Sequence, residues 1–60
     1  MKIKTKFEFC IKTNDKKICW DAGEVFEVLQ TKQNKYGSTV YVVEKEGTKF
    51  ELATYEVTIL

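Results

Sequence analysis

Apolar and polar side chains alternate along residues 2–12, and this period of two is the strongest constraint on what the chain can fold into. In an extended segment, one side carries Ile3, Thr5, Phe7, Phe9 and Ile11. The other side carries lysines, one glutamate and one cysteine. Successive side chains of a β-strand point to opposite faces, so this pattern is typical of a half-buried strand. The chain is therefore predicted to begin with a β-strand whose apolar face is buried.

The polar residues 13–16 predict a turn, after which Ile18 and Trp20 continue the apolar face. If Asn14 and Asp15 form the loop of a hairpin, the large apolar side chains of both strands fall on the same side. A slip of one residue would move one set to the opposite side, so the register is well specified. The predicted cross-strand pairs are Phe9 with Trp20, Cys10 with Cys19, Ile11 with Ile18, and Lys12 with Lys17.

The remainder of the chain has the pattern of short strands joined by short turns, without helical periodicity. Gly23 and Gly47 mark two of these turns, because glycine tolerates a positive φ. A sheet this small must curl on itself to protect its edges, so we predict an all-β fold, a single five-stranded barrel. The further strands are predicted at residues 25–31, 38–44, 48–53 and 57–60.

Sixty residues provide for one hydrophobic core, so residues 1–60 are predicted to form a single domain. A hydrophobic content of 43% and a charged content of 32% are typical of a globular chain and exclude simple disorder. No apolar run approaches the ~20 residues of a membrane helix, and the first ten residues lack the apolar stretch of a signal peptide. We therefore expect a cytoplasmic protein that does not associate with membranes.

Arginine, histidine and proline are absent from the sequence, and all ten basic residues are lysines. Without histidine the chain lacks the usual acid–base group for neutral pH. Without arginine it lacks the planar fork that binds phosphate or guanine through two hydrogen bonds. No carboxylate pair has the pattern of a buried general acid and base. We expect no catalytic residue, no metal and no cofactor, and hence not an enzyme.

Two segments resemble SH3 domains. Residues 20–24 (WDAGE), with the strand at 25–29, resemble the diverging turn and second strand of that family. Residues 52–60 resemble its closing segment, in which one short 3-10 turn, here near residues 53–56, precedes the last strand. The hairpin at Glu46 and Gly47 would be the distal hairpin of the family. The resemblance implies an SH3-like five-stranded barrel.

Other positions differ from the SH3 domains that bind proline-rich peptides. The first loop is rich in lysine rather than acidic, and the third strand opens with Ser38 where the family has tryptophan. Ala53 replaces the proline before the 3-10 turn, and Tyr55 is one position from the family's tyrosine. The resemblance therefore implies the barrel without the proline-rich-peptide site, as in SH3-like proteins of bacteria and phages.

Cys10 and Cys19 face each other in the predicted register at a non-hydrogen-bonded pair. The Cα atoms of such a pair lie about 4.5 Å apart, at the lower edge of the range that disulfides span. A disulfide here would stabilise the fold by up to about 2.7 kcal/mol in the chain-entropy model. Reduced thiols are the usual state in the cytosol. Two thiolates supply only half of a tetrahedral metal site.

Positive charge is concentrated at the start of the sequence, where residues 1–17 carry six lysines against two acids. This basic segment is either a solvated face or a surface for a partner, and exposed tyrosines could contribute to such a surface. The predicted partner-binding residues are Lys2, Lys4, Lys6, Lys12, Lys16, Lys17, Tyr36 and Tyr41.

We predict a non-enzymatic binding module that acts on a protein partner, a small regulatory protein of bacterial or phage origin. The alternative is a nucleic-acid-binding barrel in which the N-terminal lysines contact phosphates and the tyrosines stack on bases. A third interpretation is a structural subunit that pairs through an exposed edge strand. The chain is accordingly expected to be a monomer or a weak homo-oligomer.

Overall fold

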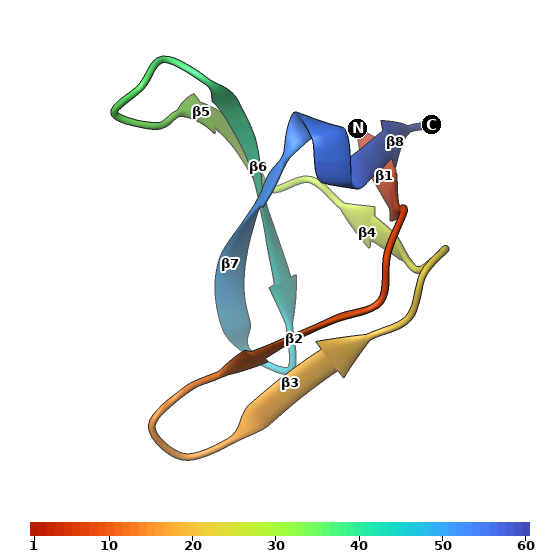
Figure 1. Ribbon diagram of the computed structural model, residues 1–60, viewed down its shortest axis with the longest axis vertical. Coiled ribbons are helices and arrows are strands. Elements are labelled where there is room, and N and C mark those ends of the chain that lie inside the picture. Colours follow the sequence, from red (N-terminus) through yellow and green to blue (C-terminus); the bar gives the residue numbers. More distant parts are fainter.

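The computed structural model describes residues 1–60 as three small antiparallel sheets (Figure 1). The first sheet has the order β4-β1-β8, the second is the hairpin β2-β3, and the third has the order β5-β6-β7. The all-β class is confirmed, but the sheets are separate and none is closed, so the structure does not show a single five-stranded barrel. The elements are β1 (Lys2–Thr5), β2 (Phe9–Lys12), β3 (Lys17–Trp20), β4 (Val25–Glu27), β5 (Gln30–Gln33), β6 (Thr39–Lys45), β7 (Thr48–Ala53), the 3-10 turn η1 (Thr54–Glu56) and β8 (Val57–Ile59).

The first hairpin has the register predicted from the sequence, with Phe9 opposite Trp20 and Ile11 opposite Ile18. The amide of Thr13 donates a hydrogen bond of 2.8 Å to the carbonyl of Lys16 and closes the loop. The pairing is well determined because one face of the hairpin must cover the core. The unfavourable pair of like charges, Lys12 opposite Lys17, is present as well.

The strand predicted at residues 25–31 is divided in the structure into β4 and β5. The division falls where the backbone changes its pairing partner. The amide of Val28 donates to the carbonyl of Met1, and the amide of Leu29 donates to the carbonyl of Val42, each at 2.8 Å. A strand that passes from one sheet into another bends at the crossing point. The sequence prediction missed this bend because residues 28–29 include no turn-forming residue.

The hairpin of β6 and β7 turns at Glu46 and Gly47, which have φ values of 53° and 79°. Positive φ at both central residues is the mark of a type I′ turn, whose twist matches that of the flanking strands. The predicted tight turn is thus confirmed. The 3-10 turn predicted near residues 53–56 is confirmed as well, as η1.

The hydrophobic core gathers side chains from all three sheets and includes a cluster of aromatic rings. The indole of Trp20 stacks on Phe50, with 4.5 Å between ring centroids and 12° between planes. Phe26 meets both rings edge-on, at centroid distances of 6.1 Å and 5.7 Å. The nine buried residues of the core cluster are Ile3, Ile18, Trp20, Phe26, Tyr41, Val43, Phe50, Leu52 and Val57.

Candidate interaction surface

Phe7 and Phe9 are exposed, by 58% and 45%, although the alternation predicts that both face inward. The chain bends between β1 and β2, and the alternation of one strand does not continue through a bend. The amide of Lys6 still bonds the carbonyl of Glu56 at 2.9 Å, and β2 then pairs only with β3. The two phenylalanines therefore lie at the border of two sheets rather than beneath one.

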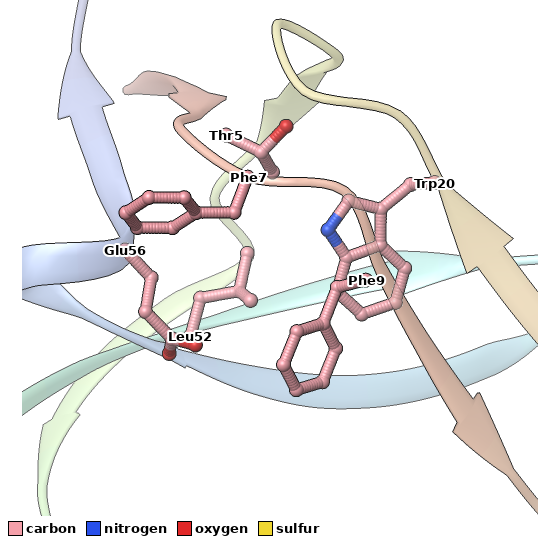
Figure 2. Close-up of a pocket in the computed structure, with 6 residues that line it drawn as sticks. All are labelled: Thr5, Phe7, Phe9, Trp20, Leu52 and Glu56. Carbon is pink, nitrogen blue, oxygen red and sulfur yellow. The ribbon is translucent and has the colours of Figure 1, made fainter.

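A small notch separates the two rings. Figure 2 shows Phe7 and Phe9 on either side of it, with the side chain of Leu52 between them and the indole of Trp20 beside Phe9. The notch has a volume of about 10 Å³, which is room for one water molecule. It is therefore not a ligand pocket, and its two exposed rings are available only to a partner that covers them from outside.

Glu56 holds its carboxylate at the rim of this notch (Figure 2). Its Oε1 atom accepts a hydrogen bond of 2.9 Å from the amide of Ala53, the residue that precedes η1. This bond satisfies a backbone donor that the turn would otherwise leave free. The carboxylate is consequently fixed beside Leu52 (Figure 2), where it gives the rim a negative charge.

A second, more open hollow of about 300 Å³ lies along the first hairpin and shares Phe9 and Trp20 with the notch. Glu8 and Asp21 contribute to its wall and are both exposed. Glu56 thus lines the notch, and Glu8 and Asp21 line the hollow that shares Phe9 with it. We call Phe7 and Phe9 the aromatic surface, and the three acids around it, Glu8, Asp21 and Glu56, the acidic rim.

The six lysines predicted to bind a partner do not form one surface. Lys2 and Lys4 lie on the outer face of β1, where Lys2 is opposite Glu27 in the neighbouring strand. The lysines around the first hairpin's loop lie at the far end of the molecule (Figure 1). Among these, Lys16 donates from Nζ to the carbonyl of Glu46. Lys6 follows β1 and is exposed.

The two tyrosines predicted to bind a partner have different environments. Tyr41 is only 6% exposed and belongs to the core, so the prediction that its ring is available for stacking is wrong. Its strand β6 is central in its sheet and is buried on both faces, which removes the in–out alternation. Tyr36 is exposed in the loop between β5 and β6, and the Nζ atom of Lys35 lies 5.1 Å from its ring centroid.

Cys10 and Cys19 lie directly opposite each other and form a disulfide. Their Cα atoms are 4.1 Å apart, as expected at a non-hydrogen-bonded pair. Both residues are exposed and contribute to the larger hollow beside Phe9. Of the three states that the sequence leaves open for these cysteines, the structure contains the disulfide.

Other chemical features of the molecule are few. No group of three or more metal-ligating side chains gathers in the structure. No helix has the length and apolar character that crossing a membrane requires. Comparison of the chain with protein-family models, curated proteins and solved structures finds no match. The aromatic surface, with its acidic rim, is therefore the feature on which a function can be argued.

Sequence reasoning missed Phe7, Phe9 and Glu56 as surface residues. The segment from Lys6 to Glu8 has no glycine, proline or asparagine, so nothing in it predicts a bend. The one available signal is the pair of phenylalanines flanking a glutamate, and alternation alone assigns such a pair to the core.

Proposed function

We propose that the chain is a non-enzymatic protein-binding module whose partner docks on the aromatic surface. The observation that carries the proposal is that Phe7 and Phe9 stay 58% and 45% exposed while flanking a common notch. Because about half of each ring is exposed, each forgoes roughly half of the 1.5–3 kcal/mol that full burial of a phenylalanine provides. Exposed apolar groups that lie together and are bordered by polar residues are typical of interaction sites.

The shape of the surface favours a macromolecular partner. A notch of about 10 Å³ is far smaller than usual ligand pockets of about 300–1,000 Å³, and the hollow beside Phe9 only reaches the lower end of that range and is open along the hairpin. An extended segment of another protein could instead place one apolar side chain between the two rings. Aromatic anchors surrounded by polar groups are the usual arrangement of residues that dominate binding energy.

The acidic rim specifies the charge of the partner. Glu56 lines the notch, and Glu8 and Asp21 line the hollow beside Phe9, whereas no lysine contributes to either. Complementary charge accelerates association and excludes partners of the wrong sign. We therefore expect a partner segment in which lysine or arginine flanks the apolar anchor.

The same charges disfavour nucleic acid as the partner. A nucleic-acid site needs basic side chains beside its stacking rings, because phosphate contacts supply most of the affinity. Here the cavities beside the exposed rings are lined by acids and by no lysine, and the lysines predicted to bind a partner do not form one surface. The alternative predicted from the N-terminal lysines therefore has weaker support than a protein partner.

We also propose that the fold is SH3-like. In support of this, β4 and β5 follow one another through a single bend and pair in two different sheets, each of three strands. Counted as one strand, they leave β1, β6, β7 and β8 as the other four, with the first hairpin as an insertion. The 3-10 turn directly before the last strand agrees with the resemblance in the sequence.

The experiment is a selection of peptides from a random phage-displayed library on the oxidised protein, followed by affinity measurements with the enriched peptides. Phe7→Ser and Phe9→Ser should each weaken binding at least about tenfold, as expected for anchor residues. Leu29→Ser is the matched control, because Leu29 is 54% exposed but lies outside the aromatic surface. Far-UV circular dichroism checks that each variant is folded.

Peptides enriched in lysine or arginine beside an apolar residue would support the proposal. Failure to enrich any peptide, or equal binding by Phe7→Ser and wild type, would overturn it. A labelled single-stranded oligonucleotide at ~50 mM salt tests the alternative, since binding that weakens steeply with added salt would favour nucleic acid.

A further inference from the structure

The two strands of the first hairpin are attached to the molecule very unequally. β3 has two side chains in the core, Ile18 with no exposed surface and Trp20 with 4%. β2 has none, because Phe9 is half exposed, Cys10 and Lys12 are exposed, and Ile11 is only partly buried. The core therefore holds β3 through two buried side chains, whereas β2 contacts the core only through the partly buried Ile11.

Three interactions attach β2 to β3. They are backbone pairing over four residues, the stacking of Phe9 on Trp20, and the Cys10–Cys19 disulfide. A two-stranded hairpin is marginally stable by itself in water. Fixed polar contacts from outside the hairpin reach β3 or the loop: Lys45 donates from Nζ to the carbonyl of Cys19 at 2.8 Å, and Lys16 contacts Glu46. Apart from the backbone at its two ends, the disulfide is thus the only covalent link that holds β2 to the rest of the molecule.

The disulfide is also accessible to reagents. Both cysteines are exposed, and they line the open hollow of about 300 Å³ along the hairpin. Thiol–disulfide exchange requires that a thiolate reach one sulfur atom, so access is a main determinant of its rate. A disulfide that serves only as a staple has no need of such access.

We propose that the Cys10–Cys19 disulfide is a reversible redox switch that controls the order of β2 and, with it, the position of Phe9. The reductant is a dithiol. Its thiolate attacks one Sγ, the bond between the two cysteines breaks, and the displaced cysteine leaves as a thiolate that takes up a proton. The second thiol of the reductant, as thiolate, then attacks the mixed disulfide and releases the other cysteine. The protein gains two electrons and two protons, and the reductant becomes a cyclic disulfide.

The consequence for binding rests on the proposed function of the aromatic surface. In the oxidised state Phe9 is held beside Trp20, which preorganises one of the two exposed rings. In the reduced state β2 detaches in a fraction of the molecules, and a partner must order it again on binding. Ordering a flexible segment on binding lowers affinity. The balance of thiols and disulfides in the surroundings would then determine what fraction of the protein is oxidised and, with it, how tightly the protein binds its partner.

The first experiment uses the free protein and does not depend on any partner. Amide hydrogen exchange is measured by NMR for the oxidised protein and for the protein treated with dithiothreitol without denaturant. We expect complete reduction and at least about tenfold faster exchange at Phe9 and Ile11, whose amides face β3 in the register. Val43, in the centre of the molecule, should keep its protection. The double variant Cys10→Ser/Cys19→Ser should exchange like the reduced protein and be unaffected by the reagent.

A disulfide that resists dithiothreitol until the protein is denatured would overturn the proposal. Unchanged exchange at Phe9 and Ile11 after reduction would overturn it as well. The second experiment compares the affinity of a selected peptide for the oxidised and reduced protein, and we expect the reduced form to bind at least about tenfold more weakly. Equal affinities would overturn the coupling to binding. A lack of peptide binding by the oxidised protein would overturn the proposed function alone, because the exchange experiment judges the switch separately.

Discussion

The ring of Phe9 stacks on the indole of Trp20, with 5.3 Å between the ring centroids and 28° between the planes. Trp20 stacks in turn on Phe50 in the core. Three rings thus form a continuous stack from the exposed surface to the interior. The position of the exposed ring consequently depends on the buried ones, and a change in the core should affect the candidate interaction surface.

Replacing Trp20 by alanine should unfold the protein. Trp20 is buried and contacts three other rings, and removing a buried tryptophan costs about 3–5 kcal/mol. The free energy of unfolding of a domain of this size is only a few kcal/mol in total. Urea unfolding followed by far-UV circular dichroism checks this. The control Phe9→Ala should lose only about 1 kcal/mol, because that ring is already half exposed. A Trp20→Ala protein that unfolds at the same urea concentration as wild type would contradict the packing described.

Replacing Thr5 by valine should destabilise the fold by about 1–2 kcal/mol. Thr5 is 4% exposed, and its hydroxyl donates to the carbonyl of Asp21 at 2.8 Å and accepts from the amide of Glu24 at 3.1 Å. Valine has the same shape but leaves these backbone groups without that partner. Thr5→Ser retains the hydroxyl and loses only a methyl group. If serine proves as destabilising as valine in urea titrations, the hydroxyl bonds are not what matters there.

Replacing Glu24 by glutamine should destabilise the protein by about 1 kcal/mol. Both carboxylate oxygens of Glu24 accept from Nζ of Lys45, at 3.0 Å and 2.8 Å, and both side chains are partly buried. Glu51→Gln is the matched control, because the pair of Glu51 and Lys32 is more exposed and should contribute less than about 0.5 kcal/mol. Thermal unfolding at low salt and at ~1 M salt measures the stability loss of both variants. The loss caused by Glu24→Gln should approach that of Glu51→Gln at high salt, because salt screens the ion pair. Equal losses for the two variants would argue against a special role of Glu24.

Replacing Glu46 by asparagine should stabilise the hairpin of β6 and β7 by on the order of 0.5 kcal/mol. Glu46 has a φ of 53°, a left-handed conformation that asparagine adopts more readily. Gly47→Ala should have the opposite effect, a loss of about 1 kcal/mol, because φ there is 79°. Melting temperatures of the two variants against wild type provide the measurement. A stabilising Gly47→Ala would show that this turn differs from the type I′ geometry.

Much of the local structure could be predicted from the sequence. The register of the first hairpin followed from the positions of Phe9 and Trp20, because only one pairing places the large apolar side chains together. The turn at Gly47 followed from its neighbours and its tolerance of positive φ. The candidate interaction surface could not be predicted in this way. Its residues lie at a bend that has no turn-forming residue to mark it.

Burial was predicted well only where a strand has one covered face. Ile3 and Ile18 belong to such strands and are fully buried, as expected. Tyr41 belongs to a central strand that is covered on both sides, so the prediction that it is exposed was wrong. The lysines were assigned correctly to exposed positions, but their separation into two regions depends on how the hairpin projects from the other sheets (Figure 1).

The all-β class, the register of the first hairpin and the positions of the turns follow from the amino-acid pattern alone, since they depend on neighbouring residues and on a period of two. Packing of the three sheets, in contrast, is what bends residues 25–31 between two sheets and leaves Phe7 and Phe9 outside the core while Tyr41 lies within it. Each of these outcomes depends on contacts between segments that are distant in the chain. Local patterns carry no information about such contacts. The exposure of Phe7 and Phe9, on which the proposed function rests, therefore could be seen only in the tertiary structure.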